Sequence, residues 1–386
     1  MLNDLTDRLN LSTLPQEFEP QYQATLNEFN EKGVFFLESD YIKYISKKTG
    51  TLSEYLPVII DAAEKIKADP DASLYALFVY YALKDRNLFI KYIGSFSYPE
   101  EYNLFNFVCL IPSIENTFSN YKKRNVPDDI IKETLKVYDE TLALYGAKNI
   151  RNDSFCWLQR YVDCIILHIG ALKHELRATN DPVYMLENKK TYERVLLFDG
   201  KEMNSAGLYY GTPPVDSVSF VTEFIETDDA YIGNPVDSSG RCLNKIVVCK
   251  KDEYELLVKP RDMFLNVHIA TNADLSKEAC DSSYKKAKEV FRLCFPEHDF
   301  KGFRCRSWLL SSELDGILKP TSNILRFKSE YNTYPLKTEG NDIFNFVFNR
   351  TFDNYNDIPE DTSLQRGIKQ IYLSGKYIYE YGGIRL

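Results

Sequence analysis

The spacing of apolar residues changes near residue 170, and this change constrains the fold more than any other feature of the sequence. In the first half, apolar residues recur every three or four positions, as over 128–145, where Pro127 and two aspartates form a helix-start signal. After residue 170 the pattern alternates, as in Leu172, His174 and Leu176, which is the period of a strand. Helices first and a mixture of strands and helices afterwards predict an α+β chain: an all-α domain followed by a mixed β-sheet domain flanked by helices.

Local signals place the individual elements. Ser53 and Ser154 open two further helices, and Gly170 is the expected stop of the second. Strands are expected at 194–198, 243–249, 254–258, 264–269, 303–310, 343–348 and 377–381, with shorter alternation over 218–224. Helices are expected at 276–295, 322–331 and 362–374, the last opened by a capping box of Thr362 and Gln365.

The length and charge of the chain limit its organisation and its partners. A length of 386 residues exceeds what one hydrophobic core usually serves, so we expect two domains, at residues 1–168 and 169–386. The formal net charge of −9 argues against a broad nucleic-acid surface, which needs clustered Lys and Arg. The N-terminus lacks the features of a signal peptide, and no apolar stretch is long enough to cross a bilayer. A soluble, cytoplasmic protein is therefore expected.

The eight cysteines and four histidines give no sign of a metal site. No two cysteines have Cys-x-x-Cys spacing, and no Cys/His run has the spacing of a zinc finger. Without a secretory signal, reduced thiols are the default. Dinucleotide-binding and phosphate-binding glycine motifs are missing too, as is the Gly-x-Ser-x-Gly pattern of hydrolases. Function must therefore be sought in less regular segments.

The segment 264–276 is the most informative of these. A predicted strand ends at Ile269, a polar loop follows, and a helix begins after Ser276. Such a junction directs several backbone N–H groups at one point, which is how many proteins hold a diphosphate. The loop has no glycine, and Asp274 precedes two more carboxylates in the helix, Glu278 and Asp281. Carboxylates also stabilise a helix start without any ligand, so a phosphate-binding role and a structural role both remain open.

This segment and several others resemble a family of acyltransferases that pair an N-terminal helical N-acyltransferase domain with a GNAT-like C-terminal domain. The other resembling segments are 125–127 with Thr134 and Leu135, Trp157 with 170–172, 303–310, 322–327 and 361–366. The resemblance covers most of the chain. It implies that acyl-CoA or acetyl-CoA is the acyl donor, that an amine is the acceptor, and that no metal takes part.

In GNAT proteins the fourth strand leads into a loop whose amides hold the pantetheine and diphosphate of acyl-CoA, and the stretch 268–276 matches that place. Ala270 stands where we expect the related family to carry proline. The resemblance implies donor-binding roles for Ile269, Ala270, Thr271, Asn272, Leu275, Ser276, Lys277 and Asn323.

Three residues are candidates for the chemistry. His268, at the end of a predicted strand, has the side chain best suited to take a proton from an attacking amine near pH 7, although a half-buried histidine bonded to backbone is the alternative. Ser307 could hydrogen-bond the substrate or the thioester, whereas the neighbouring Trp308 is expected to fill core. Tyr331 stands where many GNAT enzymes carry a tyrosine that protonates the departing thiolate, but its spacing from Phe327 also fits a buried helix face.

The leading hypothesis is an acyl-CoA-dependent N-acyltransferase that moves an acyl group to an amine of unknown identity by direct attack on the thioester. The first alternative is a catalytically inactive GNAT-like protein that binds a small molecule or a partner, which the glycine-free acidic loop favours. A structural or assembly protein is the second alternative, and the high content of Tyr and Phe is its only support.

Overall fold

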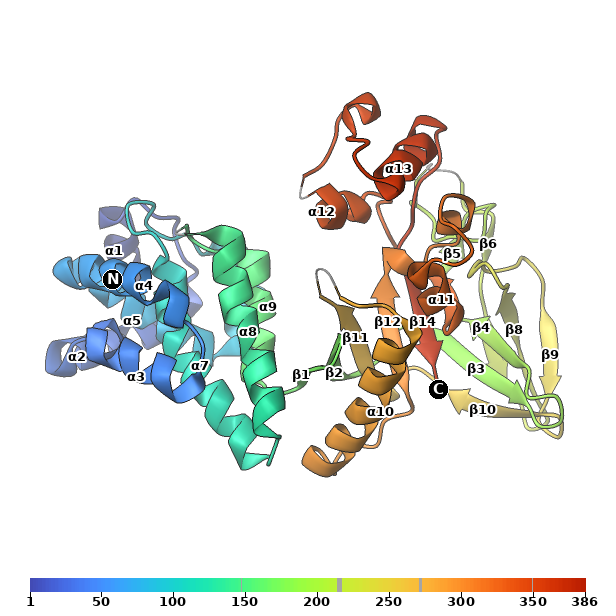
Figure 1. Ribbon diagram of the computed structural model, residues 1–386, viewed down its shortest axis with the longest axis horizontal. Helices are drawn as coiled ribbons and strands as arrows, with labels where there is room; N and C mark the ends of the chain where they lie inside the picture. Colours follow the sequence, from blue (N-terminus) through green and yellow to red (C-terminus); the bar gives the residue numbers. More distant parts are fainter. Residues whose placement is uncertain (147, 214–216, 271–272, 349) are drawn as a thin grey trace. The chain divides into compact units, whose positions relative to one another are not determined.

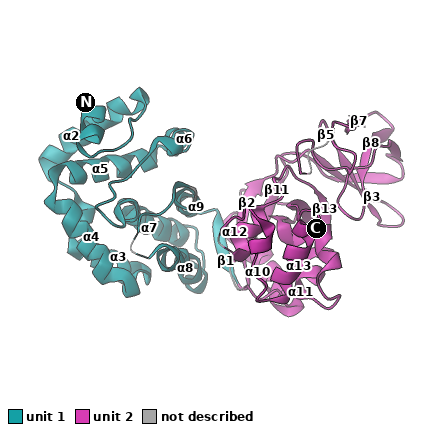
Figure 2. Ribbon diagram, turned by 90° about the horizontal axis from the view of Figure 1, so that it is seen from above, with its two compact units in different colours: residues 1–169 teal, residues 170–386 magenta. Residues whose placement is uncertain are grey.

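The computed structural model describes residues 1–146, 148–213, 217–270, 273–348 and 350–386. The chain divides into two units, Met1–Ile169 and Gly170–Leu386 (Figure 2). The first unit is helical and the second contains mixed sheets flanked by helices (Figure 1), so the predicted fold class is confirmed. In the part of the chain that the structure describes, no helix is both long and apolar enough to span a membrane, and no group of His, Cys, Asp and Glu could hold a metal ion.

Two buried helices form the core of the first unit. Almost every residue from Ala72 to Leu83 is buried, and Phe105–Ile114 is buried throughout, so these stretches lack the polar face of a surface helix. Asp69 caps the first of them by accepting from the N–H groups of Asp71 and Ala72, and Pro70 occupies its first turn. The elements of this unit are α1 (Leu2–Arg8), α2 (Glu19–Lys32), α3 (Ser39–Thr49), α4 (Leu56–Ala68), α5 (Pro70–Lys84), α6 (Arg86–Lys91), α7 (Phe105–Lys123), α8 (Asp128–Tyr145), α9 (Asn152–Val162) and β1 (Ile166–Ile169).

The second unit contains two principal sheets. Its strands are β2 (Leu172–Ala178), β3 (Val183–Asn188), β4 (Arg194–Phe198), β5 (Glu202–Met203), β6 (Phe220–Val221), β7 (Phe224–Glu226), β8 (Ala230–Val236), β9 (Val247–Lys250), β10 (Tyr254–Val258), β11 (Met263–Ile269), β12 (Phe303–Ser307), β13 (Asn332–Pro335) and β14 (Tyr381–Arg385). Its helices are α10 (Lys277–Cys294), α11 (Asn323–Ser329), α12 (Asp342–Phe348) and α13 (Ser363–Leu373). Within this unit one sheet has the order β2-β11-β12-β14-β13 and the other the order β10-β3-β4-β8-β7, with β9 beside β8.

The first of these sheets contains a parallel pair. β11 and β12 run parallel, whereas β2, β14 and β13 pair antiparallel with their neighbours. A parallel pair needs a crossover, and α10 supplies it between the two strands. The helix packs on one face of the sheet, where the ring of Tyr284 lies 4.6 Å from that of Phe303.

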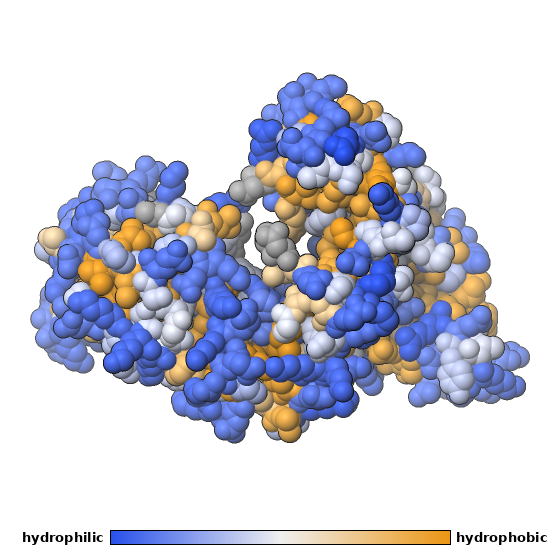
Figure 3. Space-filling view, in the orientation of Figure 1, coloured by the Kyte–Doolittle hydropathy of each residue, from blue (hydrophilic) through white to orange (hydrophobic). Residues whose placement is uncertain are grey.

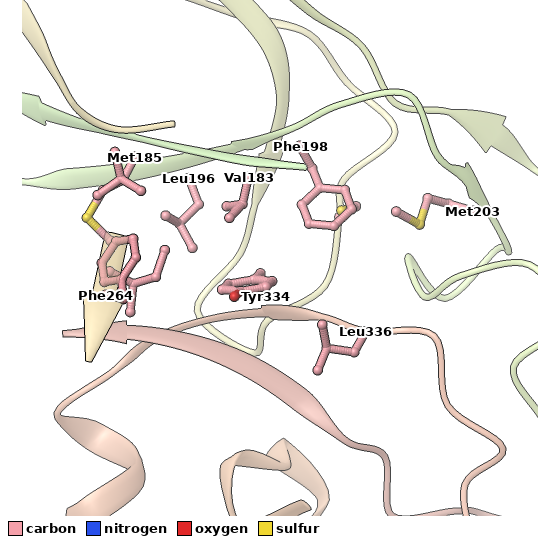
Figure 4. Packing of buried hydrophobic residues seen from close by; sticks show 11 residues of the cluster. Val183, Met185, Leu196, Phe198, Met203, Phe264, Tyr334 and Leu336 are labelled. Carbon is pink, nitrogen blue, oxygen red and sulfur yellow. The ribbon is translucent and has the colours of Figure 1, made fainter. Parts of the chain in front are cut away.

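The second sheet covers part of the opposite face. Val183, Leu196 and Phe198 point toward Phe264 and Tyr334 across a shared hydrophobic core (Figure 4). This core lies at the Phe264 end of β11. His268 lies near the other end of that strand and is not part of this core.

Several predicted elements need correction. Residues 343–348, expected as a strand, form α12, because Ile343, Phe344 and Val347 share one helix face against a hydrophobic cluster. The strand expected at 377–381 begins only at Tyr381, and the one expected at 243–249 begins at Val247. The strand expected at 303–310 ends at Ser307.

The predicted stop of the helix that follows Ser154 is also wrong, because α9 ends at Val162. Gly170 instead turns the chain between β1 and β2 with a φ of +65°, a backbone conformation that favours glycine. The predicted capping box of Thr362 and Gln365 is confirmed.

Candidate active site

The parallel strands β11 and β12 separate at their C-terminal ends. Their pairing ends at Val267 and Cys305. β11 continues to Ile269 against β2, and β12 continues to Ser307 against β14. At these ends β11 therefore stays paired with β2 and β12 stays paired with β14, but β11 and β12 are no longer paired with each other. The result is a wedge, in which the ladder between these two strands does not continue past Val267 and Cys305.

His268 stands at the mouth of this wedge and is held by a buried carboxylate. Its Nε2 lies 2.9 Å from Oε2 of Glu175, whose side chain is 1% exposed, while the side chain of His268 is 30% exposed. An ionised carboxylate can only accept, and opposite such a group Nε2 carries the proton and Nδ1 is the basic nitrogen of the neutral ring. A carboxylate that fixes the tautomer and stabilises the imidazolium is the arrangement of a general base with its orienting group.

Two further charged residues share this face of the sheet. The strand register pairs Asn266 with Arg304, and Arg306 with Gly382, so Arg306 lies on the same face as His268. Glu380 lies two residues before Gly382 and feels the charge of Arg306. Burial raises the pKa of the Glu380 carboxyl above its ordinary value, and Arg306 opposes the shift. A carboxylate just before β14 therefore lies near Arg306, which shares the face of the sheet that carries His268.

We expect Glu380→Gln to stabilise the protein at neutral pH. The folded pKa lies above the unfolded value of 4.5, so ionisation of Glu380 weakens the folded state. This cost is absent well below pH 4.5 and complete once the pH exceeds the folded pKa. Thermal unfolding from pH 4.5 to pH 8 should give a higher Tm for the variant at pH 7 and a difference that shrinks as the pH falls. Glu339→Gln, at an exposed carboxyl, is the matched control, and a Glu380→Gln variant no more stable than wild type at pH 7 would contradict the expectation.

The loop after β11 contacts the rest of the second unit through Leu275, near its end. Thr271 and Asn272, two of the predicted donor-binding residues, lie outside the described residues. Ile269 and Leu275 pack against a hydrophobic cluster formed by α12, α13 and the turn at Trp308, which is buried as predicted. Arg326 of α11 donates from Nη2 to the carbonyl oxygen of Leu275 at 2.6 Å.

The first turn of α10 has only part of its hydrogen bonding satisfied. Ser276 is the N-cap: its hydroxyl accepts from the N–H of Ala279, and its own N–H donates to Asp274. Within the helix, the N–H groups of Lys277 and Glu278 have no acceptor four residues earlier. They remain the donors that could hold an anion at this junction, next to the Lys277 ammonium.

Basic side chains offset the carboxylates around α10. Asp281 contacts both Lys277 and Arg385, and Glu330 contacts Arg385 and Arg326. The pKa of the Asp281 carboxyl is lowered, chiefly by its hydrogen bond from Lys277. Asp281 and Glu330 are thus paired with cations, which reduces the negative potential that an incoming anion would meet.

The remaining predicted site residues already make contacts within the fold. The Ser307 hydroxyl accepts from the N–H of Leu309 and caps a short 3₁₀ turn, and strand alternation places it on the face opposite His268. The Tyr331 hydroxyl lies 2.7 Å from that of Tyr284, and burial raises the pKa of Tyr331 well above its ordinary value. Asn323 is exposed at the start of α11. The structure therefore does not bring His268, Ser307 and Tyr331 onto one face.

Sequence reasoning missed Glu175 and Glu380. Glu175 follows His174 in an alternating strand and resembles any surface carboxylate until the pairing of β2 with β11 is known. Glu380 fell inside a strand expected at 377–381. Neither residue belongs to a motif, so only the register of the sheet identifies them.

The sequence profile of a family described as the GNAT-like C-terminal domain matches residues 166–385. No curated protein sequence matches the chain at a significant level. The predicted resemblance to a GNAT-like family is confirmed by the profile match, and the helical first unit agrees with it.

Solved structures share the fold over the whole chain. One is an acyltransferase mutant in complex with octanoyl-CoA, with a TM-score of 0.60 and 17% identity, covering 100% of this chain and 99% of that one. Another is an acyltransferase in complex with decanoyl-CoA and teicoplanin, with a TM-score of 0.57 and 16% identity, covering 99% and 98%. A third, in complex with decanoyl-CoA, has a TM-score of 0.60 and 16% identity, covering 99% and 98%. At this level of identity the likeness establishes the fold alone.

Proposed function

The chain belongs to the GNAT-like C-terminal domain family, and from that premise we propose that it is an acyl-CoA-dependent N-acyltransferase whose thioester enters the wedge between β11 and β12. The observation that carries the proposal is the juxtaposition at this wedge of separated parallel strands and the His268–Glu175 pair. The solved acyltransferases of the same fold, which hold CoA or acyl-CoA, support the choice of donor.

The donor would be held by backbone groups more than by side chains. In the proposal, the pantetheine lies along the open edge of β11 near Ile269 and Ala270. The diphosphate meets the first turn of α10, where Ser276 and Lys277 stand and two N–H groups have no acceptor within the helix. Thr271 and Asn272 complete the predicted loop, and Asn323 is the predicted contact from α11. Acyl-CoA is the only cofactor in this proposal.

The reaction is a direct transfer. The neutral amine attacks the thioester carbonyl, and His268 Nδ1 takes the proton that the nitrogen loses as the C–N bond forms. Backbone N–H groups at the open strand edges stabilise the oxyanion, and collapse of the intermediate breaks the C–S bond. The thiolate then takes a proton, and the Tyr331 hydroxyl, which is bonded to Tyr284 on the α10 side of the sheet, is the proposed donor to the sulfur on that side of the wedge. Ser307 remains a proposed contact to the thioester.

Glu380 has a place in the same scheme. Most amines arrive as ammonium ions, and a carboxylate beside the wedge would attract and orient such a cation before it loses its proton. Burial disfavours the charged form of Glu380 in the empty site, so an arriving cation gains more from pairing with it than it would with an exposed carboxylate.

The acyl chain would meet an apolar surface. Ile269, Leu275, Ile324 and Leu325 are partly exposed beside the cluster that contains Trp308 and Phe344. Figure 3 shows apolar surface gathered around α12. Each buried CH₂ contributes about 0.8 kcal/mol, so a longer chain should bind more tightly than acetyl.

Calorimetry with acetyl-CoA, octanoyl-CoA and decanoyl-CoA tests the proposal. We expect octanoyl-CoA to bind at least about tenfold more tightly than acetyl-CoA, a difference of roughly 1.4 kcal/mol. Leu275→Ala should reduce that ratio, because it removes part of the apolar surface next to the loop. Absence of heat with all three donors would rule the proposal out.

The alternative function is an inactive binding protein with the same fold. The observation in its favour is that Asp274 and the Ser276 hydroxyl already satisfy two of the N–H groups at the start of α10. An inactive binding protein would bind acyl-CoA without turnover or would not bind it at all. An assay for CoA release distinguishes the two functions, because only the acyltransferase releases CoA in the presence of an acceptor amine. The cytoplasmic location remains a prediction.

A further inference from the structure

The helical unit contains a hollow whose lining residues have no part in the reaction proposed above. It has a volume of about 270 Å³ and is bordered by α5, α7 and α9. These helices lie side by side in the first unit (Figure 1). A water molecule takes about 30 Å³ of liquid volume, so the hollow has room for roughly nine water-sized groups. This is the size of a small metabolite or a short peptide fragment.

A buried amide borders this hollow without an internal partner. Gln159 of α9 is 4% exposed, and its side-chain nitrogen makes no hydrogen bond to any of the described residues. Buried polar groups in folded proteins nearly always have a partner, and a group left without one destabilises the fold. Gln159 lines the hollow, so a molecule bound there could provide the missing acceptor.

Three more polar side chains on the rim are available to a ligand. In the part of the chain that the structure describes, the amides of Asn116 and Asn120 hydrogen-bond no other residue, and Lys84 pairs with no carboxylate. Lys84 lies over the rings of Tyr80 and Tyr81, at 4.3 and 4.5 Å from their centroids.

The charge of the hollow is positive, and its apolar wall is small. Arg86 and Asp163 form an ion pair with each other, which leaves the Lys84 ammonium as the uncompensated charge among the lining residues. Tyr80 and Val162 supply apolar contact. An ammonium selects a carboxylate, and side-chain amides, which both donate and accept, match a peptide group.

We propose that this hollow is a binding site for a small peptide-like carboxylate, a molecule with at least one amide group and a free carboxylate. Gln159 and the two asparagines hold the amide, and Lys84 holds the carboxylate. All the residues that line the site belong to the first unit, and none of them takes part in the proposed reaction.

Saturation-transfer NMR with N-acetyldiglycine tests the proposal on the full chain. We expect the probe to bind, and its amide form, which lacks the carboxylate, to bind at least tenfold more weakly. Gln159→Leu should weaken the acid at least tenfold while Tm is unchanged or higher, because the substitution removes an unpartnered buried amide at similar volume. Lys84→Gln should abolish the preference for the acid over the amide form, and Lys376→Gln, at an exposed lysine outside the hollow, should leave it unchanged.

Absence of binding of N-acetyldiglycine to the wild-type protein would overturn the proposal, because water alone would then fill the hollow. Binding that survives both Gln159→Leu and Lys84→Gln would overturn it as well. Neither result depends on acyl-CoA, so the proposal can fail while the proposed reaction stands.

Discussion

His268→Gln is expected to lower kcat for acyl transfer by roughly 10²- to 10⁴-fold, the range that a positioned general base contributes. The reason is the geometry at the wedge, where Nε2 lies 2.9 Å from Oε2 of Glu175 and Nδ1 is the basic nitrogen in the proposed reaction. Glutamine keeps the hydrogen bond to the carboxylate but cannot take a proton. KM for the acyl-CoA should stay within about threefold, because backbone groups hold the donor in the proposed site. Steady-state kinetics of CoA thiol release in the presence of the acceptor amine measures both constants.

Two variants make this result specific. His298→Gln changes a histidine that is 41% exposed and should leave kcat unchanged. Glu175→Gln keeps a side chain of the same shape but no longer favours the imidazolium, so it should lower kcat and alter the pH profile of kcat without changing KM for the donor. If His268→Gln retains the wild-type kcat, His268 has no part in the chemistry.

Asp181→Ala is expected to lower the free energy of unfolding by about 3–5 kcal/mol, because it leaves a buried guanidinium unpaired. The Arg304 side chain is 6% exposed and that of Asp181 is 12% exposed. The carboxylate accepts from the Nε of Arg304 at 2.9 Å and from the Tyr334 hydroxyl at 2.5 Å. Arg304, Asp181 and Tyr334 lie next to the core shared by the two sheets of the second unit. Loss of the Asp181 carboxylate should therefore weaken the packing of the sheet that forms the wedge.

Urea unfolding followed by circular dichroism measures the effect. Asp61→Ala is the matched control, because the Asp61–Lys65 pair is at least 60% exposed on both sides and should contribute less than about 1 kcal/mol. Tyr334→Phe removes one hydroxyl from the buried network and should cost about 1 kcal/mol. An Asp181→Ala variant that loses no more stability than Asp61→Ala would show that the buried pair does not support the fold.

Hydrophobic spacing carried most of the information about the fold. The change of period at residue 170 coincides with the point where the chain passes from the first unit to the second, at Ile169 and Gly170. The strands at 194–198 and 254–258 were predicted at the residues where they occur, because each is a short apolar run. In β4 both faces are packed, with Leu196 in one hydrophobic cluster and Leu197 in another. The spacing of apolar residues led to a wrong prediction at 343–348, which was expected as a strand and forms α12. Aromatic residues in that segment have a high β propensity, but contacts with α13 and the Trp308 turn favour a helix.

The candidate site was harder to predict, for a physical reason. His268 could be chosen from its residue type and its place at a strand end. Glu175 lies 93 residues earlier in the sequence and meets His268 only because β2 pairs with β11 in one register. A shift of that register by one residue would send the carboxylate to the other face of the sheet. No local pattern in a single sequence encodes such a pairing.

The most direct test of the proposed reaction is a mass-spectrometric assay with decanoyl-CoA and a mixture of primary amines that includes amino acids, amino sugars and polyamines. We expect an N-decanoyl amide and an equal amount of free CoA, both greatly reduced in His268→Gln. Release of CoA with no acylated amine, at a rate that His268→Gln does not change, would contradict it.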